Sequence, residues 1–413
     1  MRVLEKVVGL KEFRIIKAHT HYKKKIILDV ETKNNEYLCP KCQKKTSSIN
    51  HRFKHQVRDN SLSNKDTLLN INRKVFYCNP CAYSFTEKLK SVEPRHIYTK
   101  RFEQKVFEDC LENTYTRVAK SNHLTYDCVE GIYERIAEIC IQHLLSLNEE
   151  IEILGIDEIS IKKRHKDFQA VVSNVGKGYV IEVLKDRKKE TVVEYLQKLP
   201  IKAKKRIVFV SMDMWIGYFN AVKEEIEDTI IVIDRFHVMS NLNKAITSYR
   251  RNIQKKMPKE IKEKYKHYRW TILKNEDKMN EEDIERLGRM KQDCPEIEHL
   301  YNLKKQFQAI FNHTRKVERA DKKLQIWEKR VRKLDDDDMN AFLTTLSNWR
   351  EWILNYFVSN KITNGFVEGM NNKIKLIKRV GYGYRNKMNF RKRVLVECGY
   401  NNLSKSKKLI FLR

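Results

Sequence analysis

The chain has 413 residues, a length at which two or three domains can each bury an apolar core of their own. Its 84 Lys and Arg residues exceed its 54 Asp and Glu residues, and the formal net charge of +30 would repel itself unless a polyanion neutralised it. No uninterrupted apolar stretch approaches the roughly 20 residues of a membrane-spanning helix, so we predict a nucleic-acid-binding protein rather than a membrane protein.

The first segment, residues 1–95, combines short β-prone runs with two Cys-x-x-Cys pairs, Cys39 with Cys42 and Cys78 with Cys81. Four thiolates suit a tetrahedral Zn²⁺ ion, and an odd total of nine cysteines does not indicate a disulfide framework. We therefore predict a β-rich zinc module, similar to a zinc ribbon; thiols without metal are the alternative. The long interval between the pairs would hold a hairpin, in which His51 and His55 are expected at the surface.

The start of the chain mixes Lys, Glu and Arg into its apolar residues, which is not the layout of a secretion signal. We expect the protein in the cytoplasm, associated with the nucleoid when it is bound to DNA. The five cysteines outside the pairs are expected to be core residues.

Residues 96–147 change to helical periodicity, with apolar residues three and four apart. The expected buried positions are Phe102, Val106, Phe107, Val118, Val129, Ile132, Ile136 and Ile139. A polar break at 121–125 separates two helices, and Thr125 is the expected N-cap of the second. This outline predicts a DNA-binding helix-turn-helix; a helical spacer is the alternative.

Residues 148–240 alternate strands and helices in the order strand, strand, strand, helix, strand, helix, strand. This order is typical of a ribonuclease-H-like fold, whereas doubly wound proteins alternate strand and helix from the start. We predict an α+β multidomain protein whose catalytic core combines residues 148–240 and 361–413.

Residues 241–360 contain long charged helical stretches and are predicted to form a helical insertion in that core. The expected packing anchors are Trp270, Phe307, Phe311, Trp327, Phe342, Trp349 and Trp352. The acidic run 335–338 precedes an apolar helical stretch, and we interpret it as a helix N-terminus rather than a metal site.

Three carboxylates are the candidate catalytic residues. Asp157 lies within an apolar strand, where an uncompensated charge would cost several kcal/mol, and Asp213 ends the fourth strand, beside the first in this fold. Glu368 begins a helical segment whose Asn371, Asn372 and Lys375 share its face. Any one of these carboxylates alone could be a turn or cap residue; their conjunction favours a site.

Converging carboxylates suit Mg²⁺ or Mn²⁺, and two such ions can drive an in-line phosphodiester displacement. Glu158 should point away from this site because successive strand residues face opposite sides. Asp234, which ends the last strand, is a reserve candidate. The sequence has no Gly-x-x-x-x-Gly-Lys loop, so ATP hydrolysis is not predicted.

A basic tail with interleaved aromatic residues follows Glu368, and this pattern favours contact with DNA over a merely solvated face. The cations are Lys373, Lys375, Lys378, Arg379, Arg385, Lys387, Arg391, Lys392 and Arg393, and the aromatic residues are Tyr382, Tyr384 and Phe390.

Four segments resemble the ISL-three family of insertion-sequence transposases, which are DDE-type enzymes. They are LGIDE (154–158), VSMDMWIGY (210–218), VIDRFHV (232–238) and EGMNNKIKLIKRVGYGYRN (368–386). The resemblance implies that Asp157, Asp213 and Glu368 bind the catalytic metals and that Asp234 and His237 support the site. It also implies cleavage at the ends of a mobile element by water, followed by attack of the freed 3′-hydroxyl on target DNA.

Two other functions remain open at this stage. A zinc-containing, sequence-specific DNA-binding regulator derived from a transposase would bind DNA without cutting it. A structure-specific nuclease of the same fold would cut branched DNA without joining ends. For a transposase, the expected partners are double-stranded terminal repeats and target DNA, and the two ends favour a homo-oligomer.

Overall fold

The computed structural model describes residues 2–21, 24–147, 150–162, 167–264, 269–359, 361–362, 365–384 and 386–401. The described part of the chain divides into two compact units, one up to residue 139 and the other from residue 140 onward. In the described part of the chain, no helix is both long and apolar enough to cross a membrane.

The first unit begins with a short helix and a five-stranded sheet in which β1, β2, β6 and β5 are neighbours in that order and β7 pairs with β6. The elements are α1 (Arg2–Val8), β1 (Phe13–His21), β2 (Lys25–Thr32), β5 (Ile49–Leu62), β6 (Lys65–Cys78) and β7 (Tyr83–Thr86). A small hairpin of β3 (Tyr37–Leu38) and β4 (Lys45–Thr46) precedes β5.

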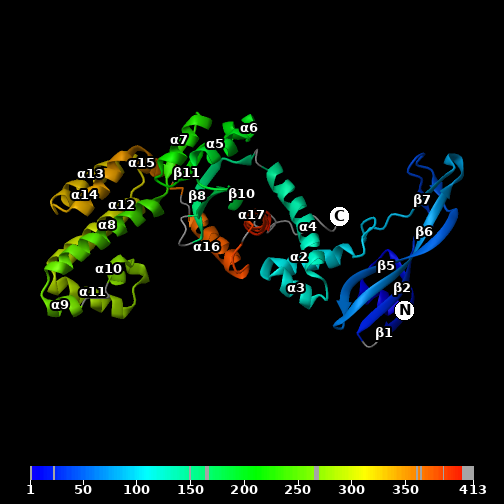
Figure 1. Ribbon diagram of the computed structural model, residues 1–413. Helices are drawn as coiled ribbons and strands as arrows, with labels where there is room; N and C mark the ends of the chain where they lie inside the picture. Colours follow the sequence, from blue (N-terminus) through cyan, green and yellow to red (C-terminus); the bar gives the residue numbers. More distant parts are fainter. Residues whose placement is uncertain are drawn as a thin grey trace. The chain divides into compact units, whose positions relative to one another are not determined.

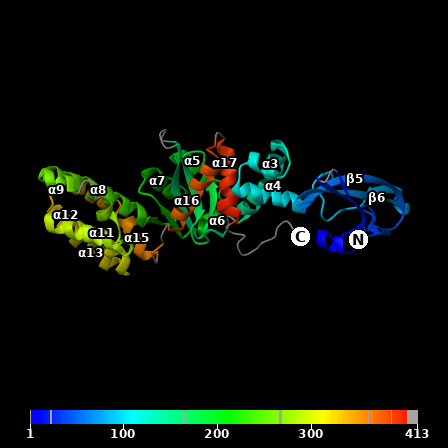
Figure 2. The same cartoon turned by 90° about the horizontal axis from the view of Figure 1, so that it is seen from below.

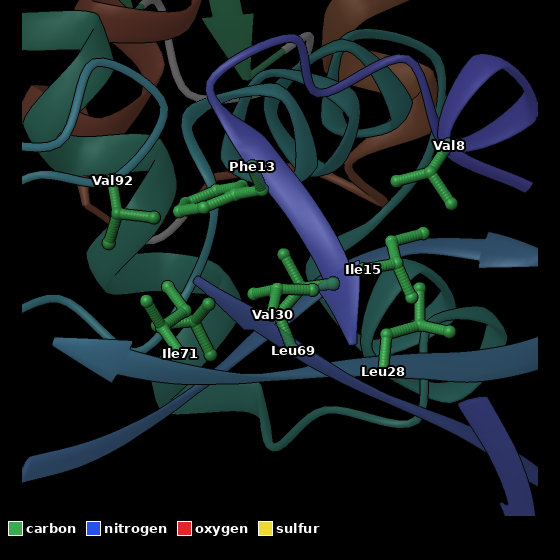
Figure 3. Close-up of a cluster of buried hydrophobic side chains, with 9 residues drawn as sticks. Val8, Phe13, Ile15, Leu28, Val30, Leu69, Ile71 and Val92 are labelled. Atoms are coloured by element: carbon green, nitrogen blue, oxygen red, sulfur yellow. The ribbon is translucent and has the colours of Figure 1, made fainter. Parts of the chain in front are cut away.

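One face of this sheet carries the module's apolar core, to which alternate residues of the strands contribute. Figure 3 shows Phe13 and Ile15 of β1, Leu28 and Val30 of β2, and Leu69 and Ile71 of β6 in this cluster, together with Val8 and Val92. The predicted β-rich character of the segment is therefore present in the structure.

Three helices follow, α2 (Lys100–Glu112), α3 (Tyr115–Ser121) and α4 (Tyr126–Ser146), and the last seven residues of α4 already belong to the second unit. Threonines cap all three, because Thr99, Thr114 and the predicted cap Thr125 each accept a backbone N–H with the side-chain oxygen. The expected apolar positions are buried except for Ile139, which is 44% exposed. That prediction was wrong because Ile139 lies beside the covered stripe of α4, whereas Ile136 and Cys140 lie on it.

The second unit is built on a mixed sheet in the order β10, β9, β8, β11, β12. Its strands are β8 (Ile153–Lys162), β9 (Asp167–Asn174), β10 (Tyr179–Val183), β11 (Phe209–Met212) and β12 (Ile230–Ile233). In this sheet β9 is antiparallel to both of its neighbours, β8 and β10, whereas β8, β11 and β12 are parallel. This agrees with the strand sequence and the neighbours predicted for β8.

Helices flank this sheet. The segments between the strands form α5 (Lys189–Gln197), α6 (Ile201–Arg206) and α7 (Ile216–Glu225), of which α6 was not expected. After the insertion come α16 (Gly365–Val380), α17 (Lys387–Val394) and the π-helix η4 (Leu395–Tyr400). Figure 1 shows α16 and α17 on the other side of the sheet from α5 and α7. Ile374 and Ile377 are buried, as the helical spacing predicted.

In its described residues the insertion consists of helices and the segments that join them, and its first helix begins directly after β12, whereas residue 241 was the predicted start. Its helices are α8 (Arg235–Lys256), α9 (Lys259–Lys264), α10 (Arg269–Leu273), α11 (Glu281–Asp293), α12 (Pro295–His313), α13 (Val317–Arg332), α14 (Asp337–Asn348) and α15 (Arg350–Val358). Figure 2 shows α8, α11, α12 and α13 running along one another, and α12 contacts each of the other three.

Most of the predicted aromatic anchors pack as expected. Phe307, Phe311, Trp327 and Phe342 are buried and contact one another, and Trp349 and Trp352 pack edge-on against Phe219 of α7. Trp270 is the exception, because 70% of its surface is exposed. The five-residue helix α10 buries Thr271 and Ile272 and turns Trp270 outward.

The acidic run 335–338 forms a helix N-terminus, as interpreted from the sequence. Asp336 is the N-cap of α14 and accepts the backbone N–H of Met339 at 3.0 Å, while Asp337 and Asp338 lie in the first turn. Carboxylates at these positions are favoured by the helix dipole.

Replacing Asp336 with Ala should lower the stability of the second unit by about 1 kcal/mol through loss of the cap, which corresponds to a drop in Tm of roughly 2–4 °C. All five tryptophans lie in this unit, so thermal unfolding followed by tryptophan fluorescence reports it selectively. Asp337→Ala, which removes an exposed carboxylate but no cap, is the matched control. Equal melting of both variants would contradict the capping role.

Candidate functional site

Asp157 and Asp213 meet at one edge of the mixed sheet. The parallel pairing of β8 with β11 places Met212 opposite Ile156, so the next residue of each chain segment is an aspartate. Only 6% of the surface of Asp157 is exposed. Ligand oxygens of the two aspartates and a ring nitrogen of His237 all lie within 4.8 Å of one another.

His237 enters the site from the first turn of α8. Its Nε2 atom forms an ion-pair contact with Asp213 Oδ1 and lies 3.8 Å from Asp157 Oδ1. Asp234 is outside this cluster: it is the N-cap of α8 and its side chain accepts the N–H of Phe236 at 3.2 Å. The cap fixes where α8 begins and thereby where His237 points.

The surroundings of the cluster shift the pKa values of Asp213 and His237. The pKa of Asp213 is raised to about 6, mainly by burial and also by the charge of Asp157, although the neighbouring His237 acts to lower it. Burial lowers the pKa of His237, but its hydrogen bond to Asp213 and the nearby carboxylates outweigh burial, so the net shift is upward. A buried pair of this kind is stabilised by a positive charge placed between the carboxylates.

Asn371 of α16, which the sequence placed on the Glu368 face without assigning it a role, contacts Asp157. Its Nδ2 donates to Asp157 Oδ2 at 2.6 Å and joins α16 to β8. Lys378, two turns later in α16, donates to the Ser160 carbonyl at 3.0 Å and strengthens the same junction. The signal was present, because Asn371 is three residues after Glu368 and shares its helix face.

Glu368 lies in the first turns of α16, but its side chain is outside the described part of the chain. The neighbouring acid Glu158 is not in the cluster; its carboxylate pairs with Arg187, as its place in the strand predicted.

The donor set of the cluster is chemically suited to a hard divalent cation. Carboxylate oxygens are the ligands that Mg²⁺ and Mn²⁺ prefer, and an imidazole nitrogen is compatible with Mn²⁺. The residues present therefore fit a metal centre at this edge of the sheet.

A second cluster consists of the four predicted cysteines in the first unit. The sulfur atoms of Cys39, Cys42, Cys78 and Cys81 all lie within 4.8 Å of one another, and all nine cysteines are free. Burial raises the pKa of Cys39, but the backbone N–H groups of Cys42 and Lys41 and the neighbouring thiols lower it to about 7, which favours the thiolate form. His51 and His55, both on β5, do not belong to the cluster, as expected.

Several cations of the predicted DNA-binding tail bind other parts of the second unit. Lys373 donates to the Glu397 carbonyl, Arg391 makes a bidentate pair with Glu182, and the buried Arg393 pairs with Glu397. These contacts support a structural role for the three residues, and Lys387 similarly pairs with Asp167.

Other members of the tail face solvent. Lys375 and Arg379 are exposed and Tyr382 is 93% exposed, so they stay predicted DNA contacts. Tyr384 instead packs on the buried Phe390, and Arg385 lies outside the described residues.

Comparison with known proteins shows the family of this chain. A model described as a transposase of the ISL3 type matches residues 154–394, more than half of the chain and a span that includes both carboxylate-bearing strands and α16. A second model, described as the helix-turn-helix domain of transposase family ISL3, matches residues 87–137, which include α2 and α3. The chain belongs to transposase family ISL3. This confirms the resemblance that the sequence motifs indicated.

Two relatives are insertion-sequence transposases. The transposase is 24% identical to the transposase for insertion sequence element IS1001 of Bordetella parapertussis over 356 residues, which is 86% of each chain. It is 24% identical over 257 residues, 56% of each chain, to the transposase for insertion sequence element IS1557 of Mycobacterium tuberculosis. A helix-turn-helix and a transposase domain together establish DNA as the partner.

Removing the side-chain amide of Asn371 should lower the DNA-cleavage activity of the transposase without unfolding the protein. Hydrogen bonds to charged groups are worth about 1.5–3 kcal/mol, so Asn371→Ala should lower the rate of DNA cleavage by roughly tenfold or more. Cleavage of DNA carrying the element's own ends measures this, with a gel-shift assay to confirm that DNA binding persists. Leu376→Ala, an exposed position on the same helix, is the control. Wild-type cleavage by Asn371→Ala would show that the contact is dispensable.

Proposed function

We propose that this transposase is a DDE-type enzyme that cleaves DNA at the ends of its insertion sequence with two Mg²⁺ or Mn²⁺ ions bound by Asp157, Asp213 and Glu368. The observation that carries the proposal is the meeting of the buried Asp157 with the partly buried Asp213, with His237 against both. A buried acidic pair is costly unless a cation compensates it, which makes a purely structural role a poor explanation.

A ribonuclease-H-like core is the proposed fold. The sheet has three antiparallel strands followed by two parallel ones, in the order β10, β9, β8, β11, β12, and helices on both sides. The strand order that this fold requires puts the first and fourth strands side by side, and β8 and β11 are neighbours here.

Glu368 is proposed as the third metal ligand on the basis of its place in α16. Residues three apart in a helix share a face, and Asn371 of that helix donates to Asp157. The helix position that precedes Asn371 by one turn is therefore on the side of α16 that meets the carboxylates. The four-residue stretch that follows Glu368 includes no other acid.

The protein groups of the site have distinct tasks. Asp157 and Asp213 hold their oxygens toward one point; Asn371 Nδ2 orients Asp157, and His237 Nε2 holds a proton toward Asp213 Oδ1. The ions, when bound, activate the attacking oxygen and stabilise the leaving one. Water attacks the phosphorus, the bond from phosphorus to the 3′ oxygen breaks, and the freed 3′-hydroxyl then attacks a target phosphodiester, which releases a second 3′-hydroxyl.

The first unit is proposed to recognise the terminal repeats. The helices α2, α3 and α4 supply the helix-turn-helix, and we propose that the four-cysteine cluster holds a structural Zn²⁺ ion that fixes the β3–β4 hairpin to the end of β6. Two element ends must be brought together for transfer, so we propose a homo-oligomer on DNA.

Asp157→Asn, Asp213→Asn and Glu368→Gln should each abolish cleavage and strand transfer while DNA affinity stays within about twofold, because the ligand set is lost and the DNA-binding unit is not. Cleavage and joining are measured on DNA carrying the element's own ends with Mg²⁺ or Mn²⁺. Asp228→Asn, an exposed acid between α7 and β12, is the control and should keep full activity.

The same assay discriminates the competing functions. Binding without cleavage by the wild-type protein would support a DNA-binding regulator. Cutting of branched DNA without joining would support a nuclease. Loss of folding in all three acidic variants would make these residues structural.

The zinc proposal predicts that the purified transposase releases a single Zn²⁺ ion per chain when its thiols are modified with a mercurial, as a colorimetric zinc indicator would show. Cys39→Ser should release little zinc and should lose DNA affinity, because apo zinc modules fold poorly. Cys128→Ser, a partly exposed cysteine of α4 outside the cluster, should keep its zinc. A wild-type protein free of zinc would overturn the proposal.

A further inference from the structure

A pocket of about 660 Å³ lies in the insertion, between the start of α8, the helix α10 with the segment after it, and α12. This volume is in the range of small-ligand sites and admits a nucleotide but not a duplex. Five cationic residues line the pocket: Arg235, Lys244, Arg269, Lys274 and Lys278. Asp234, engaged as the N-cap of α8, is the one acidic residue among its described lining residues.

Two exposed aromatic rings stand in the wall of this pocket. Trp270 is 70% exposed and Phe236 is 52% exposed, although large aromatic side chains are usually covered in a folded protein. Cations combined with solvent-facing rings are the chemistry that binds single-stranded nucleic acid, because phosphates meet the cations and bases stack on the rings.

The wall that carries Trp270 is held rigidly. Lys304 of α12 is only 1% exposed, and its Nζ atom donates to the carbonyls of residues 272, 273 and 274 at 2.9, 2.7 and 2.9 Å. These bonds satisfy the C-terminal carbonyls of the short helix α10, which could not be stable alone. The buried Lys304 thus holds the C-terminal end of α10, the helix that carries the exposed Trp270.

The pocket also contains a hydrogen-bond donor without a partner among the described residues, the Nε atom of Arg269. Arg269 lies over the Trp270 ring at 5.0 Å, and its Nε atom is shielded from solvent without a hydrogen-bond partner among the described residues. A buried guanidinium N–H without a partner is costly, and a phosphate oxygen would satisfy it.

The pocket adjoins the carboxylate cluster. Phe236 lines the pocket, and its ring meets that of the next residue, His237, edge-on at 5.4 Å between centroids. His237 in turn contacts Asp213. A DNA strand at the carboxylates can therefore place a neighbouring nucleotide in the pocket without leaving the surface of α8.

We propose that this pocket binds an unpaired nucleotide of the DNA strand next to the cleavage site, with its base stacked on Trp270 and its phosphates on Arg269, Lys244 and Lys278. The inference rests on the proposed function for the identity of the strand. Removing a base from the duplex costs a few kcal/mol, and stacking in the pocket offsets that cost. The pocket would thus hold the strand open beside the reacting phosphate.

The test uses the full-length transposase and a short oligothymidylate carrying a central 2-aminopurine, whose fluorescence is quenched by stacking. Trp270→Ala should weaken binding about 5- to 100-fold, as expected for the loss of one stacked base, and should remove the quenching. Trp270→Phe should restore most of both, and Lys244→Ala should weaken binding without removing the quenching. Ile284→Ala, an exposed position on α11 outside the pocket, is the control.

Two further measurements separate a loss of base stacking from a loss of folding or of general DNA affinity. Affinity for a duplex of the same length should be unchanged in Trp270→Ala, and the fluorescence of the four remaining tryptophans should show an unchanged Tm. Single-strand binding and quenching equal to wild type in Trp270→Ala would overturn the inference. If the inference failed in this way, DNA cleavage that depends on Asp157 would still support the proposed function. If instead the pocket bound the single strand but no protein cleaved DNA, the proposed function would be overturned and the binding site would stand.

Discussion

The second unit is organised around two carboxylates that are forced together. Parallel pairing of β8 with β11 fixes the register at Ile156 and Met212, and the next residues, Asp157 and Asp213, must then share one edge of the sheet. Burial, and to a lesser extent the charge of Asp157, raises the pKa of Asp213 to about 6. Among the described residues, the backbone N–H of Glu158 in β8 and two helical side chains, His237 of α8 and Asn371 of α16, contact this pair.

Helix α8 connects the chemistry of the site with the insertion. Its cap, Asp234, follows β12, the strand next to β11, so the helix starts beside the carboxylates and its first turn brings His237 against them. The same helix then becomes the first helix of the insertion and provides one wall of the basic pocket. A single continuous helix therefore joins the carboxylate site to the insertion.

The large positive charge is used in two ways. Some cations act within the protein: Lys304 caps a helix, Lys378 joins α16 to β8, and Arg391 closes on Glu182. Each of these bonds fixes a helix within the second unit. Other cations, such as Lys375 and Arg379, remain exposed and leave the surface free to meet a polyanion. Counting charges along the chain does not separate the two groups, because the difference lies in what each side chain meets after folding.

Local patterns in the sequence were enough to predict the strand order, the cysteine cluster, the cap at Thr125 and the meeting of Asp157 with Asp213, because strand and helix periods and short motif spacings are local properties. They predicted which residues share a helix face, but not which face another segment covers. Only the tertiary structure decided that Asn371 reaches Asp157, that Ile139 and Trp270 are exposed, and that Arg393 is buried with Glu397. Each of these depends on contacts between segments far apart in the chain, and helical periodicity carries no information about the partner surface.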